Sequence, residues 1–175
     1  MLALIPRNEI NDIFTENIKK PSEFREDNEK IDHYFGGLYA IEFDFDAAPG
    51  KTISDPEYLH ALDKFSTWLR DQPNVKSVRS YTDIIKRLNK NMHGDDDAYY
   101  KIPDNQAEAA QYLLLYELQQ PFGADISHYL KPDKSATKLV VTLSSMDSLA
   151  FKRVGEGYNQ WIKENMPGYM QAESG

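Results

Sequence analysis

Cysteine is absent from the 175-residue sequence, so the chain can form no disulfide, no thiolate metal site and no thiol nucleophile. No apolar run approaches the roughly 20 residues that a membrane-spanning helix needs. Cations are also in deficit, with 20 Lys and Arg against 28 Asp and Glu and a net charge of −8. This balance disfavours nucleic acid or an anionic membrane surface as a main partner, because both bind a clustered basic face.

Short catalytic motifs are missing as well. The sequence contains no G-x-S-x-G nucleophile elbow and no P-loop, and GEGYNQ places its two glycines inside a predicted helix. No two of the four histidines (His33, His60, His93 and His128) stand four residues apart, as they do in helical zinc sites. We interpret each as a surface or half-buried histidine, and we expect neither an enzyme nor a bound cofactor.

Hydrophobic periodicity predicts three strands and four helices after a short amphipathic helix near the N-terminus. In the first strand, LYAIEFDFD, large apolar residues alternate with mostly acidic ones, which predicts one buried and one polar face. The other strands are VKSVRSY and SATKLVVTL, and the closing MQAESG is too short to predict a strand. The helices are SDPEYLHALDKFSTWLRDQPNV, DIIKRLNKNM, DNQAEAAQYLLLYEL and SLAFKRVGEGYNQWIKENMPGY. Gly155 and Gly157 in the last helix are expected to allow close packing on the sheet.

This order of elements predicts an α+β fold, specifically a ferredoxin-like split β-α-β sheet with a helical insert and a truncated last strand. We assign residues 1–35 to an N-terminal helical segment and 36–82 to the first β-α-β half. Residues 83–130 form the helical insert, and residues 131–175 form the second β-α half. Because the sequence stops where a fourth strand would begin, we expect the chain to be a piece of a larger protein.

The run RLNKNMHGDDDAYYKIP holds the strongest candidate for a metal site. Asp95, Asp96 and Asp97 next to His93 offer oxygen ligands for a hard cation, but consecutive side chains do not all point inward and EF-hand spacing is missing. We favour a solvated turn between two helices, broken at Gly94, over a small metal-dependent enzyme.

The acidic row of the first strand raises a similar choice. Glu42, Asp44 and Asp46 lie on one face and can in principle support acid–base chemistry. We interpret this row as the wet side of a sheet.

Aromatic residues gather in the insert and its flanks. They are Tyr99, Tyr100, Tyr112, Tyr116, Phe122 and Tyr129. Tyrosine combines a large apolar body with a polar tip, so these side chains suit the lining of an apolar groove. The alternative is that they pack the two insert helices onto the sheet.

Several stretches together resemble the large extracytoplasmic loop of resistance-nodulation-division superfamily exporters of the MMPL branch. They are WLRDQPNV, DIIKRLNKNMHGDD, AAQYLLLYEL, the PFG break and DKSATKLVVTL, and upstream LIPRNEINDIFTENI resembles the segment that leaves a membrane helix. The likeness covers about residues 4–170. The chain departs from the family pattern at QQPFGADISHYLKP.

The resemblance implies a periplasmic domain of a proton-driven inner-membrane exporter of hydrophobic or lipid-like substrates, with a porter-subdomain type of fold. Its partners would be the remaining transporter chain, including the transmembrane helices and the other periplasmic loop, and the hydrophobic substrate. Self-association is left open. No catalytic residue or metal ligand is implied, and residues 1–35 would follow a membrane span.

Within this interpretation, we expect the substrate to pass along Tyr112, Tyr116, Phe122 and Tyr129. The rival hypothesis is a protein–protein interaction module that touches no substrate, for which an exposed apolar patch without a cavity would be typical.

Overall fold

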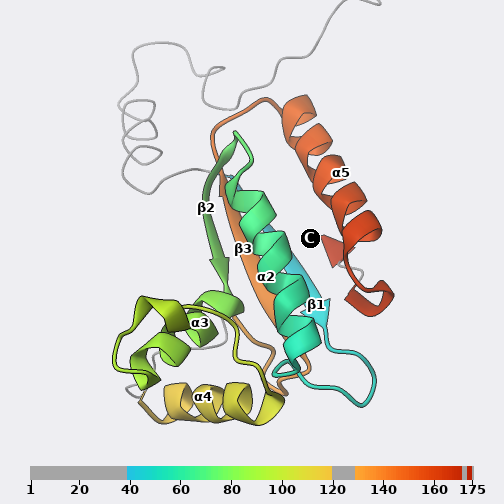
Figure 1. Cartoon of the computed structure of the whole chain (residues 1–175). Helices are drawn as coiled ribbons and strands as arrows, with labels where there is room; N and C mark the ends of the chain where they lie inside the picture. Colours follow the sequence, from blue (N-terminus) through green and yellow to red (C-terminus); the bar gives the residue numbers. More distant parts are fainter. Residues whose placement is uncertain (1–38, 120–128, 171–172, 175) are drawn as a thin grey trace, which may run out of the picture.

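The computed structural model describes residues 39–119, 129–170 and 173–174, which form an α+β fold with an antiparallel sheet (Figure 1). The strands are β1 (Tyr39–Asp46), β2 (Val75–Ser80), β3 (Ala136–Leu143) and β4 (Glu173–Ser174). The helices are α2 (Pro56–Arg70), α3 (Tyr81–Met92), α4 (Gln106–Gln119) and α5 (Ser148–Asn165), with the short 3-10 helices η2 (Asp97–Tyr99) and η4 (Gly168–Met170). The predicted N-terminal helical segment lies outside the described residues.

The sheet has the strand order β2-β3-β1-β4, and each neighbouring pair is antiparallel. The alternation predicted for β1 is confirmed, since Ile41, Phe43 and Phe45 are buried. Phe43 lies opposite Leu139 of β3 in the central pair. The final strand is real but only two residues long, and it pairs with β1 at Phe43 and Asp44.

Helix α2 begins with the capping residues that its sequence offers, and it ends at Arg70, before Pro73. The Asp55 side chain caps the helix by accepting a 3.0 Å hydrogen bond from the Glu57 amide, and Pro56 occupies the first turn. One face of the helix, which includes Leu59, Leu62 and Phe65, is buried against the sheet.

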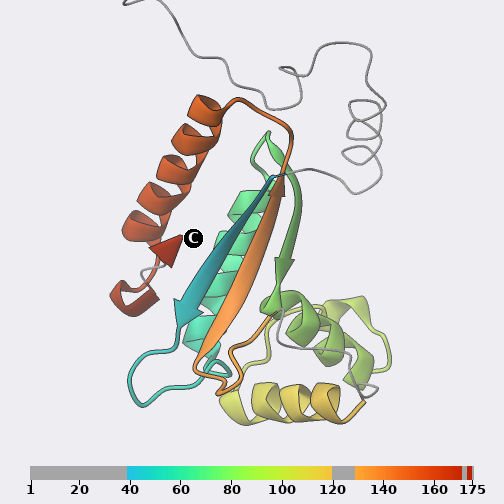
Figure 2. The same ribbon diagram turned by 180° about the vertical axis from the view of Figure 1, so that it is seen from behind.

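Helices α2 and α5 cover the same face of the sheet. The ring of Phe43 on β1 lies 5.3 Å from that of Phe65 on α2 and 6.4 Å from that of Tyr158 on α5. The two helices also meet directly, because the rings of Trp68 and Trp161 stack at 4.9 Å. In both views α2 lies over the strands and α5 lies beside it, past β1 (Figures 1 and 2).

The predicted role of the α5 glycines is wrong. A Cβ atom built on Gly155 or Gly157 would meet no atom within 4 Å, so neither glycine permits a close approach of helix to sheet. Contact with the sheet comes instead from the buried Tyr158 and Ile162.

The insert helices pack at one end of the sheet (Figures 1 and 2). Helix α3 starts directly after β2, because Ser80 is both the last strand residue and the cap that accepts from the Thr82 amide. Asn89 of α3 then donates from Nδ2 to the Lys101 carbonyl at 2.9 Å, which holds the chain that leads to α4. Ile85 and Leu113 of the insert belong to the same buried cluster as the sheet residues.

Candidate functional site: a basic, tyrosine-lined pocket

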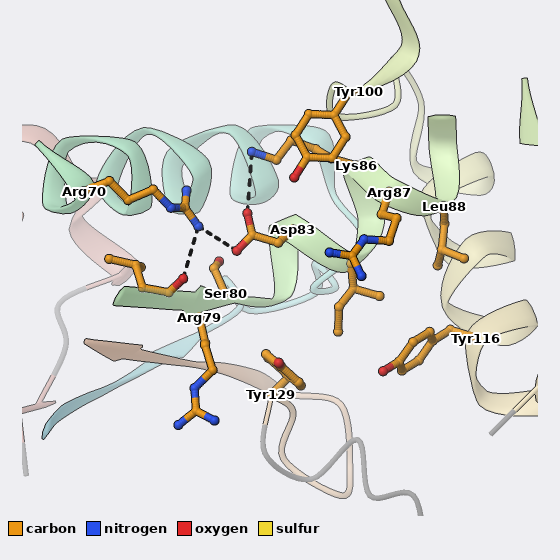
Figure 3. Close-up of a pocket in the computed structure, with 12 residues that line it drawn as sticks. Arg70, Arg79, Ser80, Asp83, Lys86, Arg87, Leu88, Tyr100, Tyr116 and Tyr129 are labelled. Carbon is orange, nitrogen blue, oxygen red and sulfur yellow. Dashed lines mark hydrogen bonds and ion pairs between the residues drawn. The ribbon is translucent and has the colours of Figure 1, made fainter. Parts of the chain in front are cut away.

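A pocket of about 620 Å³ opens where β2, α3, α4 and the segment at Tyr129 meet. Its wall combines four cationic side chains with three tyrosines and three aliphatic residues (Figure 3). Sizes of this order are typical of small-molecule sites, where apolar walls carry a few placed polar groups. The pocket is therefore the candidate functional site of the described structure.

Two of the four cations are neutralised by carboxylates. The Arg70 guanidinium lies 2.6 Å from Oδ2 of Asp83 and donates to the Val78 carbonyl at 3.3 Å. The Lys86 ammonium lies 2.6 Å from Oδ1 of Asp63 and 3.8 Å from Oδ1 of Asp83. Two carboxylates thus balance two cations at this side of the pocket.

Arg79 and Arg87 have no such partner among the residues that the structure describes. Both side chains line the pocket and both are exposed, Arg79 from β2 and Arg87 from α3. Across residues 39–119, 129–170 and 173–174, neither guanidinium forms an ion pair, and in Figure 3 the dashed network joins Arg70, Asp83 and Lys86 without reaching either one. The pocket wall therefore carries an excess of about two positive charges, in a chain whose net charge is −8.

The rest of the wall is aromatic and aliphatic. Tyr100 presents its ring to the Lys86 ammonium at 5.3 Å, a cation–π contact that fixes this lysine further. Tyr116 of α4 and Tyr129 line the pocket as half-buried rings, together with Leu88 of α3. A bound molecule would therefore meet both charged and apolar side chains.

The structure brings together two of the four tyrosine and phenylalanine residues predicted to line a substrate path. Tyr116 and Tyr129 line the pocket, whereas Phe122 lies outside the described residues. Tyr112 does not line the pocket, because its side chain is only 3% exposed and packs in the core. For Tyr112 the packing alternative is the correct one.

Tyr112 is held by polar neighbours. Its hydroxyl donates to Oε1 of Glu108 at 2.8 Å and lies 3.2 Å from Oδ1 of Asn89. Burial, with the nearby Glu108 carboxylate, raises the pKa of Tyr112 to about 12. The side chain therefore links α4 to α3 and stays neutral at ordinary pH.

Sequence reasoning missed the cations of the pocket. Arg79 and Arg87 stand eight residues apart with no motif around them. The position of the two arginines could have indicated the site. A strand that passes directly into a helix brings exposed residues of both elements to one junction.

The carboxylates of the acidic turn after α3 contact different partners. Asp96 caps η2 by accepting from the Ala98 amide at 2.9 Å, and Asp97 pairs with Lys90, which lowers the pKa of Asp97. The His93 ring stacks on Tyr99 at 3.7 Å, with Nδ1 2.8 Å from the Asn89 carbonyl oxygen. No three potential metal-ligating carboxylates or imidazoles converge anywhere in the part of the chain that the structure describes.

The carboxylates of β1 have cationic neighbours on the face away from the helices. Oε2 of Glu42 lies 3.8 Å from the Lys138 ammonium, and Oδ1 of Asp46 lies 3.0 Å from the Lys131 ammonium. These ion pairs neutralise two of the three carboxylates in the row, while Oδ1 of Asp44 is buried without a hydrogen-bond partner among the described residues.

Ser135 and Lys138 have the spacing of an S-x-x-K motif, which sequence reasoning also missed. The Ser135 hydroxyl donates to Oδ1 of Asp133 at 2.6 Å, while Lys138 lies beside Glu42. Ser135 precedes β3, and its hydroxyl contacts Asp133 and not the lysine that would activate it.

Comparison of the chain with known protein families, curated proteins and solved structures finds no match. Among the helices in the described ranges, none has the length and apolar character to cross a membrane.

Proposed function

We propose that this chain is an extracytoplasmic domain of an exporter of the resistance-nodulation-division superfamily, MMPL branch, and that it contacts a hydrophobic or lipid-like substrate. The observation that carries the proposal is the pocket between the sheet and the helical insert. It has the volume of a small-molecule site and holds Tyr116 and Tyr129, two of the side chains expected along a substrate path.

We further infer that the fold is ferredoxin-like. The strand order β2-β3-β1-β4 with antiparallel neighbours supports this topology, as do two connecting helices on one face of the sheet. In this arrangement α3 and α4 are an insertion between the second and third strands. The pocket then lies at the junction of a rigid sheet and a family-specific addition.

In the proposed function the domain performs no covalent chemistry. The apolar surface of the substrate is transferred from water to contact with Tyr116, Tyr129 and Leu88. This transfer stabilises the complex by about 25 cal/mol for each Å² buried. Passage onward would follow movement of the domain against the rest of the transporter, driven by the proton gradient in the membrane.

A photoreactive fatty acid tests substrate contact. The purified chain is irradiated with a diazirine-bearing fatty acid, and the labelled residues are mapped by mass spectrometry. We expect labels at or next to Tyr116 and Tyr129, with competition by excess unlabelled fatty acid. Tyr129→Ala should lower the yield, whereas Tyr99→Ala, on η2 outside the pocket, should leave it unchanged.

Labels confined to positions away from the pocket would contradict the proposed substrate path. The transporter context has its own test, which is the coding sequence on either side of this segment. Hydrophobic spans of transmembrane length on both sides are expected, and their absence would overturn the periplasmic, inner-membrane assignment.

A second candidate function, a protein–protein interaction module, is supported by α4. Leu114 and Leu118 lie one turn apart and are 54% and 73% exposed. Leu114→Ser with Leu118→Ser should then abolish a self-association seen by analytical ultracentrifugation, while fatty-acid labelling at the pocket persists. A chain that is monomeric with and without the substitutions would remove this candidate in its self-associating form.

A further inference from the structure

The charge pattern of the pocket defines a ligand class more narrowly than hydrophobicity does. Arg70 and Lys86 are satisfied by Asp83 and Asp63, so they add little net attraction for a ligand. Arg79 and Arg87 line the pocket and form no ion pair with a carboxylate among the described residues.

We infer that the pocket binds an amphipathic anion, whose phosphate or carboxylate group is held by Arg79 and Arg87 and whose apolar part lies against Tyr116 and Tyr129. This inference rests on the proposed function, because it names the class of substrate that would enter the same pocket.

Guanidinium chemistry supports the anionic half of the inference. Each arginine carries a planar fork of N–H donors that matches the paired oxygens of phosphate and carboxylate groups. Hydrogen bonds between charged partners are about twice as strong as neutral ones. Two such forks in one wall of an otherwise acidic protein favour an anion over a neutral or cationic molecule.

Both arginines lie in regular secondary structure, so the fold fixes their backbone positions. Arg79 lies on β2 opposite Val140 of β3, and Arg87 lies on the second turn of α3. Ser80 joins the two elements, with its hydroxyl 2.8 Å from that of Thr82 and accepting from the Thr82 amide. No loop separates the strand from the helix, so both guanidinium groups extend from regular backbone.

Pocket size and wall composition support the apolar half. A bare phosphate ion would fill only a small part of about 620 Å³. The remaining wall includes Tyr116, Tyr129 and the aliphatic side chains of Ile84 and Leu88, which offer an anion few further donors. A ligand with a hydrocarbon or aromatic body uses this surface, whereas an inorganic ion does not.

Isothermal titration calorimetry with matched probes tests the inference on the purified chain. The probes are decyl phosphate, decanoate, decanol and decyltrimethylammonium, which share one alkyl chain, and inorganic phosphate, which has none. All are used below their micelle-forming concentrations. We expect decyl phosphate and decanoate to bind at least about tenfold more tightly than the other three.

Arginine variants locate the anion. Arg79→Gln and Arg87→Gln should each weaken decyl phosphate binding about tenfold, in line with the loss of a charge-assisted hydrogen bond. Arg87→Lys keeps the charge but loses the planar fork, so its affinity should fall between that of the parent chain and Arg87→Gln. Arg153→Gln on α5 is the matched control, because this exposed arginine is not part of the pocket. Circular dichroism and thermal melting check that each variant is folded.

The possible outcomes distinguish a failure of the anionic ligand class from a failure of the proposed substrate contact. If decanol binds as tightly as decyl phosphate and the arginine variants bind unchanged, the anionic class is wrong while hydrophobic substrate contact stands. If inorganic phosphate matches decyl phosphate, the amphipathic class is wrong. If no alkyl probe binds the folded chain, both this inference and the proposed substrate contact fail.

Discussion

The ammonium group of Lys86 on α3 lies 2.6 Å from Oδ1 of Asp63 on α2. Lys86 is only 8% exposed, so this ion pair joins the insert to the helix that covers the sheet in a region with little water. The pair also sets the charge of the pocket, because it removes one of four cations from competition for a ligand.

Asp63→Ala should lower the free energy of unfolding by about 2 kcal/mol, because it leaves a buried ammonium without its nearest carboxylate. Urea unfolding followed by circular dichroism measures the change. The matched control is Glu156→Ala on α5, whose 4.0 Å pair with Lys152 is 66–74% exposed and should contribute less than about 0.5 kcal/mol. Equal effects at both positions would show that burial of the Lys86 pair has no energetic consequence.

Alkaline pH should destabilise the fold through its buried tyrosines. Burial raises the pKa of Tyr58, whose hydroxyl donates to the Phe45 carbonyl at 2.7 Å, and the pKa of Tyr112 is about 12. A raised pKa means that the folded chain holds the phenolic proton more tightly than the unfolded chain, whose tyrosines titrate near pH 10. Stability is therefore complete below pH 10 and decreases as the pH rises through the folded-state values.

Thermal melting at a series of pH values measures this slope. Tyr58→Phe should lower stability at pH 7 by about 2 kcal/mol, since it removes the buried hydrogen bonds to the Phe45 carbonyl and the Thr137 hydroxyl, yet it should flatten the decline above pH 10. An unchanged slope in Tyr58→Phe would mean that this hydroxyl does not contribute to alkaline unfolding.

Calcium, magnesium and manganese ions should leave the melting temperature unchanged, as should a chelator. The reason is geometric, since Asp96 caps η2 and Asp97 pairs with Lys90, so these carboxylates face different partners. Differential scanning calorimetry with and without each ion makes the measurement. A rise in melting temperature that Asp95→Asn or Asp97→Asn abolishes would instead support the metal-site hypothesis.

Removing one ring of the tryptophan stack should loosen α5 from α2. Trp161→Ala should cost about 2 kcal/mol, less than for a fully buried ring, because Trp161 is half-buried. Trp68 then becomes the sole tryptophan, and its fluorescence emission should move to longer wavelength as water reaches it. Leu149→Ala on the exposed side of the same helix should change neither property, and a similar loss there would contradict this account of the contact.

Local sequence rules predicted much of the fold. The alternation of β1 and the Asp55 and Pro56 start of α2 require only nearest-neighbour chemistry, and the structure contains both. Periodicity was less reliable at the end of α3, where Met92 continues the apolar stripe but is 56% exposed. The helix extends past the core at this point, and no local signal marks where packing partners end.

The candidate site was harder to predict because it depends on contacts between distant segments. Tyr112 and Tyr116 stand one turn apart on the same helix, yet the first is in the core and the second lines the pocket. Tyr112 differs from Tyr116 in that its hydroxyl donates a hydrogen bond to Oδ1 of Asn89 on α3. Whether an arginine keeps a free guanidinium likewise depends on which carboxylates the fold brings near it.

The direct passage from β2 into α3 has a mechanical consequence. Strand β2 and helix α3 meet at Ser80 without a loop between them, and each element carries one arginine of the pocket. The backbone positions that carry the two arginines are then fixed when the chain folds, with little backbone freedom left to lose. Binding an anion there would order the two exposed arginine side chains but little backbone, which lowers the entropic cost of capture.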